Sequence, residues 1–230
     1  MTQLPHMKTV RDYPSMLSKL WTFTLVEGAF VAWLCWLRIP AVHAALGSAP
    51  ITFGGVQLPW LIVAVALAYA TFVNMIKLHD RISDVFRIRH NFDVYRILLP
   101  LAVGAGVRLP TSKITEVSRQ RQHLMRRAFY RYASSTKAEI DQHDVTMALN
   151  QWGWYWICLE GAVAGAIGTI ALAVASQFEA ALLLFAGPVA LLCIARLFYE
   201  SCSGHALSEV DAILDDDARR AAVVKEFGAL

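Results

Sequence analysis

Residues 152–175 read WGWYWICLEGAVAGAIGTIALAVA, and this stretch decides the fold class. Its only charged residue is Glu160, and a helix of about 20 apolar residues is long enough to cross the roughly 30 Å hydrocarbon core of a bilayer. Three further blocks have comparable length and character, namely Leu20–Leu37, Trp60–Ile76 and Ala180–Phe198. The sequence therefore predicts an all-α membrane protein whose four transmembrane helices form two hairpins.

The composition agrees with this prediction and gives no sign of an enzyme. Hydrophobic residues make up 57% of the chain and charged residues only 17%, whereas soluble domains have about 25% charged residues. The sequence contains no phosphate-binding glycine loop, serine-hydrolase motif or zinc-protease motif. The His-Asp pairs at 79–80 and 143–144 lack the further ligands that a metal-dependent phosphohydrolase needs. We expect no catalytic residue, no metal and no cofactor.

The distribution of lysine and arginine predicts the orientation in the membrane. Residues 39–59 contain neither residue type, whereas residues 79–151 contain twelve. Lysine and arginine accumulate in the cytoplasmic loops of membrane proteins. We therefore expect an integral protein of the bacterial inner (plasma) membrane, with both termini and residues 79–151 in the cytoplasm.

These patterns divide the chain into four segments. We expect an N-terminal arm and the first transmembrane hairpin, a basic cytoplasmic helical layer, the second transmembrane hairpin, and an acidic cytoplasmic helical tail. Their boundaries are 1–78, 79–151, 152–199 and 200–230.

Local signals predict where the shorter elements begin and end. The Gly54-Gly55 pair between β-prone triplets predicts a small hairpin on the outer side, with an irregular interfacial loop as the alternative. No breaker follows the second apolar block, so we expect its helix to continue through residues 77–88. Further helices are expected over 92–103, interrupted by Pro100, and from 113 to about 133.

Two capping patterns predict the starts of the last two helices. Thr136 with Glu139 forms a capping box, which predicts a helix that runs on into the third apolar block. Ser208 is a favoured N-cap residue, so we expect the tail helix to begin there.

A short repeat suggests that the two hairpins are related. Trp21 is followed after five residues by Glu27-Gly28-Ala29, and Trp154 is followed in the same way by Glu160-Gly161-Ala162. Residues 82–88 then resemble residues 207–213. This pattern is typical of a parallel duplication about an axis along the membrane normal, although chance similarity is the alternative.

Polar residues within the apolar blocks are the first candidates for function, because a charge inside a membrane is costly. Glu27 and Glu160 lie at matched depth and could form an acidic ring in an oligomer, which would select cations. The alternative for Glu160 is a structural ion pair with Arg196, which we expect at the same height. Glu27 has no charged partner as well matched in height, since the nearest polar group in its own hairpin is Asn74. Glu27 is therefore a better candidate than Glu160 for a group that faces water.

Two further sets of residues have both a structural and a functional interpretation. Small residues on the third helix allow close helix packing, either within the chain or between subunits, and they are Gly161, Gly165 and Gly168. Arginines of the cytoplasmic layer suit phosphate groups, and they are Arg119, Arg121, Arg126, Arg127 and Arg131. Attraction to anionic lipids is the alternative for this second set.

These features favour an oligomeric channel or pore that is regulated through its basic cytoplasmic layer. The alternative is a non-conducting membrane scaffold or sensor that anchors a cytoplasmic partner or a larger complex. The expected partners are membrane lipids, further copies of the chain, and a cytoplasmic protein or an anionic nucleotide or nucleic-acid ligand.

Overall fold

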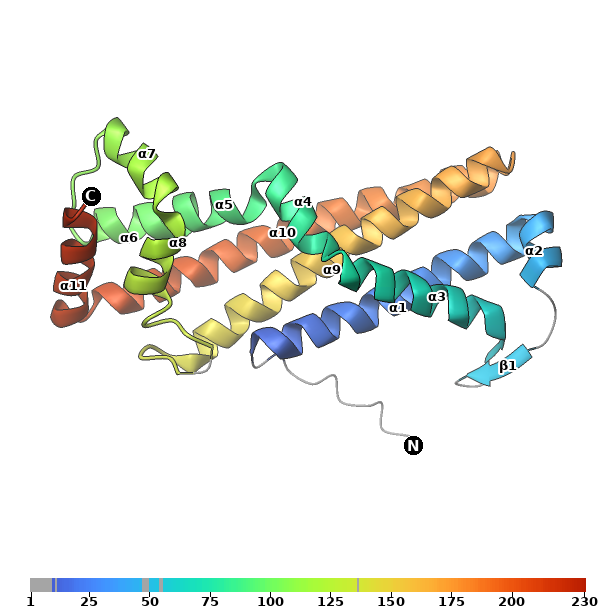
Figure 1. The fold of residues 1–230 in the computed structure, drawn as a ribbon, viewed down its shortest axis with the longest axis horizontal. Coiled ribbons are helices and arrows are strands. Elements are labelled where there is room, and N and C mark those ends of the chain that lie inside the picture. The colour runs from blue at the N-terminus through green and yellow to red at the C-terminus, as the bar shows by residue number, and fades with distance from the viewer. Residues whose placement is uncertain (1–9, 11, 47–49, 54–55, 136) are drawn as a thin grey trace. The chain divides into compact units, whose positions relative to one another are not determined.

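The structure is a computed structural model that describes residues 10, 12–46, 50–53, 56–135 and 137–230. Helices dominate it, and a single pair of short strands connects α2 to α3 in the part described (Figure 1). The elements are α1 Tyr13–Arg38, α2 Pro40–Leu46, β1 Pro50–Phe53, β2 Val56–Pro59, α3 Trp60–Met75, α4 Leu78–Phe86, α5 Ile88–Phe92, the π-helix η1 Asp93–Leu98, α6 Leu99–Gly104, α7 Thr111–Arg119, α8 Arg121–Leu124, the π-helix η2 Met125–Phe129, α9 Gln142–Val174, α10 Phe178–Leu214 and α11 Asp217–Gly228.

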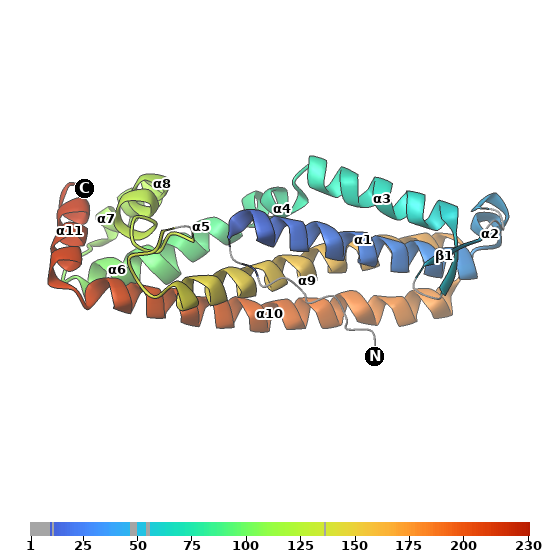
Figure 2. The same cartoon turned by 90° about the horizontal axis from the view of Figure 1, so that it is seen from below.

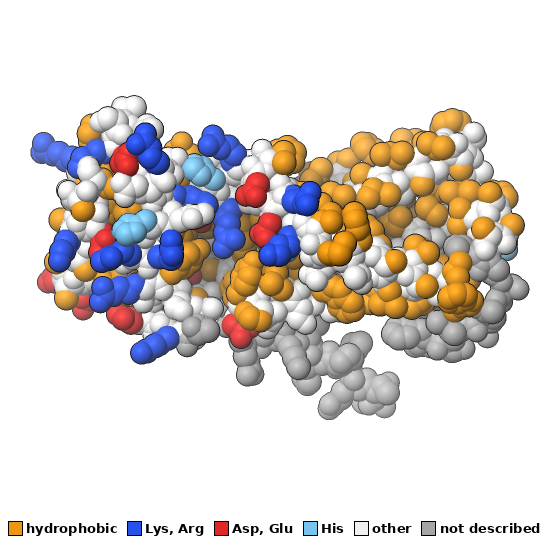
Figure 3. Space-filling view, viewed as in Figure 1, with side chains coloured by type: hydrophobic (Ala, Val, Ile, Leu, Met, Phe, Trp, Pro, Cys, Tyr) orange, Lys and Arg blue, Asp and Glu red, His pale blue; other side chains and the backbone are white. Residues whose placement is uncertain are grey.

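The chain forms two compact units. We call residues 17–79 with 153–197 the apolar unit, and the described residues up to 16 with 80–152 and 198–230 the polar unit. In Figure 3 the Lys, Arg, Asp and Glu side chains gather on the polar unit, whereas hydrophobic side chains cover most of the visible apolar unit. Helices α9 and α10 contribute residues to both units.

Within the described residues, three helices are long and apolar enough to cross a membrane, namely α1, α9 and α10. Helices α3 and α4 reach this length only if they are taken as one span, and the pair is bent by 49° at its break. Leu182, Leu183 and Leu197 of α10 are exposed although they are strongly apolar, as expected for side chains that face lipid. The predicted set of four spans therefore depends on whether the bent pair crosses the membrane as a unit.

The prediction of an unbroken helix through residues 77–88 is wrong. Lys77 has φ 49° and Arg87 has φ 54°, a left-handed conformation that ends regular α-helical hydrogen bonding. The backbone N–H of Lys77 bonds to the carbonyl of Asn74, three residues back, at 3.1 Å. Nothing in the side-chain chemistry of lysine or arginine signals these breaks.

Close helix contacts hold the apolar unit together. Figures 1 and 2 show α1 and α3 side by side, and a Cβ on Gly28 would lie 2.7 Å from the ring of Tyr69. A Cβ on Gly165 would lie 2.7 Å from Pro188 of α10, and one on Gly168 would lie 2.6 Å from Val31 of α1. These small residues of α9 therefore pack against helices of the same chain.

The polar unit has a hydrophobic core of its own. Leu98 and Leu101 from the η1–α6 helix pack with Val117 of α7, Ile213 of α10 and Phe227 of α11. The η1–α6 helix ends at Gly104, one residue beyond the predicted end at residue 103, and Gly106 follows with φ 82°. Pro100 lies in the first turn of α6, where the missing N–H costs little.

Both predicted helix starts are wrong. Helix α9 begins at Gln142, and residues 137–141 are not helical, while Thr136 lies outside the described residues. Helix α10 passes through Ser208, whose hydroxyl donates to the carbonyl of Gly204 at 3.3 Å within the helix. The cap of α11 is Asp216, whose Oδ1 accepts the backbone N–H of Arg219 at 2.8 Å. Serine can cap a helix or bond back within it, so its presence alone does not locate a helix start.

The predicted outer hairpin falls on β1 and β2. The two strands pair antiparallel, with Ile51 opposite Leu58 and Phe53 opposite Val56. Its turn residues Gly54 and Gly55 lie outside the described residues.

Candidate functional site

A hollow of about 380 Å³ in the polar unit gathers most of the arginines that the sequence singled out. We call it the basic hollow, and its lining residues are His90, Ser118, Arg119, Gln120, Arg121, Gln122, His123 and Arg126. Every one of these side chains is polar and none is acidic. The lining therefore offers hydrogen-bond donors and positive charge to a ligand.

A break between α7 and α8 brings these residues together. Helix α7 ends at Arg119, Gln120 leaves the helical conformation with φ −91° and ψ 13°, and α8 begins at Arg121. Residues on both sides of the break therefore line one hollow instead of separating around a continuous helix. His90 of α5 joins the site because its Nε2 lies 2.8 Å from Oγ of Ser118.

Arg121 is held in place by an ion pair with the buried side chain of Asp93. Its Nη1 donates to Oδ2 of Asp93 at 2.8 Å, and both side chains are largely buried. Burial raises the pKa of Asp93 to about 6, although Arg121 and Arg89 act in the opposite direction. At neutral pH the Asp93 carboxylate is therefore mainly ionised and fixes the guanidinium of Arg121.

The other two arginines of the hollow are more accessible. The side chain of Arg119 is 74% exposed, against 18% for Arg121, and its Nη1 lies 3.1 Å from Oε2 of Glu116. Arg126 is exposed, and its Nε donates to the carbonyl of Gln122 at 3.3 Å. Burial together with Arg121 and Arg87 lowers the pKa of His90, so this histidine is a neutral hydrogen-bonding group at pH 7.

The remaining predicted arginines lie elsewhere. Arg127 forms an ion pair with Glu226 of α11 at 3.1 Å, and the guanidinium of Arg131 lies 5.6 Å from the ring centre of Tyr132. The structure therefore divides the predicted set into three residues that share a site and two that do not.

In the apolar unit, the predicted ion pair between Glu160 and Arg196 is wrong. Glu160 is 1% exposed, and its carboxylate contacts Thr24 and His79, while Arg196 lies exposed on α10. The contact distances are 2.7 Å from Thr24 Oγ1 to Glu160 Oε2 and 3.5 Å from His79 Nδ1 to Glu160 Oε1. Two residues at the same height on adjacent helices can still point in different directions. The predicted pair rested on height alone.

Glu27 also faces the interior of its own chain. A Cβ on Gly161 would lie 2.6 Å from Glu27 Oε1, and Glu27 Oε2 is buried without a hydrogen-bond partner among the residues that the structure describes. Asn74 is exposed, and with Glu160, His79 and Thr24 it lines a small cavity of about 10 Å³, room for about one water molecule. Thr24 was not predicted as a partner of Glu160, although it lies one helical turn before Glu27. His79 was weighed only as a metal ligand.

Comparison with known proteins places the chain in a family without supplying an activity. A family model described as the YmfE protein family matches residues 12–225, which include the basic hollow and both membrane carboxylates. No curated protein and no solved structure was found to match the chain.

Proposed function

We propose that this chain, which belongs to the YmfE protein family, is a multi-pass membrane sensor that binds a small phosphate-bearing compound in its basic hollow. The apolar unit would anchor it in the bacterial inner membrane through α1, the α3–α4 pair, α9 and α10. The asymmetry of Lys and Arg supports a cytoplasmic polar unit and cytoplasmic termini.

The observation that carries the proposal is the shared lining of the hollow by Arg119, Arg121 and Arg126. Guanidinium groups present planar pairs of donors that match phosphate oxygens. Ser118 and Gln122 add uncharged hydrogen-bonding groups to the same lining. A volume of about 380 Å³ lies within the range of small-molecule sites, and it suits a compact ligand better than a long nucleic acid.

A free phosphate compound and a phospholipid headgroup share this chemistry, and one binding experiment separates them. Full-length protein in phosphatidylcholine nanodiscs is titrated calorimetrically with ATP and with pyrophosphate. We expect binding of at least one probe, with an affinity that falls as salt rises because the charges are exposed to solvent.

Adding the anionic lipid phosphatidylglycerol to the discs then tests whether lipid headgroups occupy the basic hollow. Loss of ATP binding in those discs would assign the hollow to headgroups, and unchanged binding would assign it to a free compound. Failure of both probes to bind in phosphatidylcholine discs, together with no measurable preference of the protein for phosphatidylglycerol, would overturn the proposal.

A conducting oligomer is the second candidate, and the buried oxygen of Glu27 without a hydrogen-bond partner is the observation that favours it. Such an oxygen could take up a passing cation. We rank it lower because Glu27 and Glu160 both point into the helices of one chain. Cation flux through reconstituted vesicles that Glu27→Gln reduces would support the channel, and the absence of flux in monodisperse protein would exclude it.

A further inference from the structure

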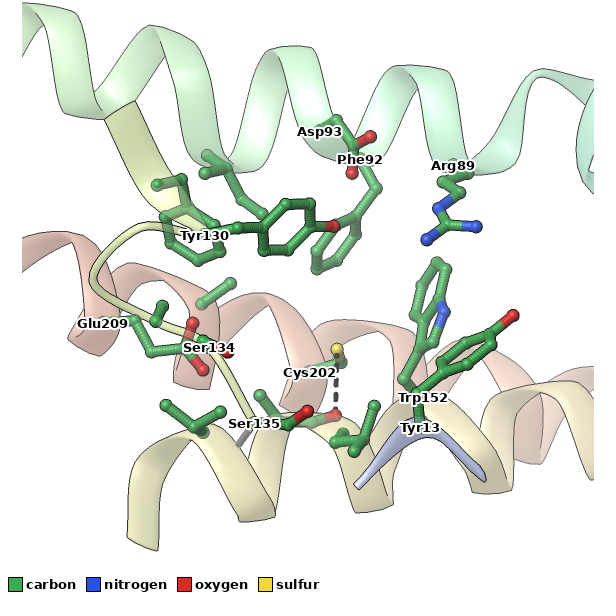
Figure 4. A pocket seen from close by; sticks show the side chains of 17 residues that line it. Tyr13, Arg89, Phe92, Asp93, Tyr130, Ser134, Ser135, Trp152, Cys202 and Glu209 are labelled. Carbon is green, nitrogen blue, oxygen red and sulfur yellow. Dashed lines mark hydrogen bonds between the residues drawn. The ribbon is translucent and has the colours of Figure 1, made fainter. Parts of the chain in front are cut away.

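A second cavity in the polar unit has a different chemistry from the basic hollow. It has a volume of about 310 Å³ and is lined mainly by apolar and aromatic side chains, among them Phe92, Phe129 and Trp152 (Figure 4). Three of its lining residues, Tyr13, Arg89 and Tyr130, are exposed, so the cavity opens to solvent on their side. Its size and apolar walls are typical of sites for small organic molecules.

Glu209 is the unusual residue of this cavity. It lies on α10, lines the cavity, and is only 4% exposed. Among the described residues it makes no side-chain hydrogen bond and no ion pair, and burial, with a further contribution from the charge of Asp144, raises its pKa to about 8. Ionising a carboxyl group that is buried without a partner is costly, so a positively charged ligand would favour the ionised form of Glu209 and pair with it.

The other charged groups of the cavity already have partners. Asp93 and Tyr130 favour the charged form of Arg89 electrostatically, and Asp93 is bonded to Arg121. Figure 4 shows Arg89 and Glu209 at opposite ends of the cavity, with Phe92 between them. Glu209 is therefore the acidic residue of this cavity that has no positively charged partner, as far as the described residues show.

The aromatic wall is well organised to receive an organic cation. The ring centres of Phe92 and Trp152, which both line the cavity, are 4.9 Å apart. Packed rings of this kind offer π-faces that attract cations. Their apolar surface also favours a ligand with a hydrocarbon or aromatic body.

We propose that this cavity binds a small protonated organic amine, with its ammonium group against Glu209 and its apolar body against Phe92 and Trp152. The site is separate from the basic hollow, so it stands or falls independently of the proposed phosphate ligand. The polar unit would then bind two kinds of metabolite, one anionic and one cationic.

A comparison of isosteric ligands tests this inference without any mutation. Full-length protein in detergent is titrated calorimetrically at pH 7.5 with phenethylamine, and with 2-phenylethanol as its neutral counterpart. Benzylamine and tryptamine vary the apolar body. We expect at least one amine to bind, and its neutral counterpart alcohol to bind about ten-fold more weakly or worse, because the ion pair is lost.

Two variants then test whether Glu209 provides the negative charge that binds the amine. Glu209→Gln should weaken amine binding about ten-fold and leave alcohol binding unchanged. Asp211→Asn, on an exposed residue of the same helix, should change neither. Binding of none of the three amines to the wild-type protein, or equal binding of amine and alcohol, would overturn the proposal, as would equal effects of the two variants.

Discussion

The hydroxyl oxygen of Thr24 lies 2.7 Å from Oε2 of Glu160 and thereby joins α1 to α9 inside the apolar unit. The same oxygen lies 2.9 Å from the carbonyl of Leu20. A hydroxyl carries one proton, so Thr24 shares it between two acceptors, the carboxyl group of Glu160 and the carbonyl of Leu20. Thr24 is therefore the hydrogen-bonding partner that α1 supplies to a Glu160 side chain that is only 1% exposed.

This relationship predicts which of two substitutions lowers the free energy of unfolding more. Glu160→Gln should be nearly neutral, because the amide oxygen can still accept the Thr24 hydroxyl. Thr24→Val should lower the free energy of unfolding by about 1–3 kcal/mol, because it leaves Glu160 without that partner. Thr22→Val is the matched control, since Thr22 is exposed and its hydroxyl bonds only within α1, to the carbonyl of Ser18 at 2.9 Å. Denaturant titration in detergent measures all three, and equal losses for the two threonine variants would contradict the prediction.

The glycines of α9 and α10 predict a graded series of alanine substitutions. Gly165→Ala should be the most destabilising, by about 1–3 kcal/mol, because its Cβ would lie 2.7 Å from the rigid ring of Pro188. Gly161→Ala should cost less, because the flexible end of Glu27 can move away. Gly187→Ala meets nothing within 4 Å and should be neutral or slightly stabilising, since alanine favours a helix over glycine. Thermal unfolding ranks the three, and a neutral Gly165→Ala would refute the packing on which the order rests.

Asp93 predicts how stability depends on pH. Burial raises its pKa from 3.8 to about 6, so the folded protein holds this proton more tightly than the unfolded chain does. The stabilisation from protonated Asp93 is therefore fully present below about pH 4 and is lost as the pH rises through 6. Relative to Asp93→Asn, wild-type protein should lose stability between pH 4.5 and pH 7 in thermal scans. A relative gain would mean that the ion pair with Arg121 outweighs burial.

The orientation of the chain can be tested by labelling from one side of the membrane. The native cysteines Cys35, Cys158, Cys193 and Cys202 are first replaced, and a single cysteine is then introduced at Gln57 or at Lys113. A thiol reagent that cannot cross membranes should modify the Gln57→Cys protein in intact cells and spare the Lys113→Cys protein until the cells are opened. The reverse pattern would invert the topology and remove the basic hollow from the cytoplasm.

The sequence predicted those features that depend on local pattern. The apolar blocks anticipated α1, α9 and α10 because burial in a membrane requires a long apolar run. The predicted end of a helix at residue 103 lies close to the end of α6 at Gly104, and Gly106 beyond it adopts the left-handed conformation that glycine allows at low cost. Lys77 adopts the same conformation without any such signal, so the break between α3 and α4 was missed.

The features that escaped prediction depend on tertiary contacts. The partners of Glu160 come from α1 and from the start of α4, and only the rotational phase of each helix decides which side chains meet. The division of the arginines has the same origin, because Gln120 interrupts the helix and directs Arg119 and Arg121 into one hollow. The cavity beside Glu209 is formed by residues of α1, α5, η1, η2, α9 and α10 and of the loop that follows η2, so no local pattern in the sequence indicates it.

The most direct test of the proposed function compares two pairs of arginines that carry the same charge. Arg119→Gln with Arg126→Gln removes two positive charges from the basic hollow, and Arg127→Gln with Arg131→Gln removes two from outside it. ATP or pyrophosphate binding, whichever the wild-type protein shows, is measured for both variants in phosphatidylcholine nanodiscs at one salt concentration. The account predicts a loss of about ten-fold or more for the first variant and less than about two-fold for the second. Equal losses in two folded variants would mean that only net charge matters, and would contradict a built phosphate site.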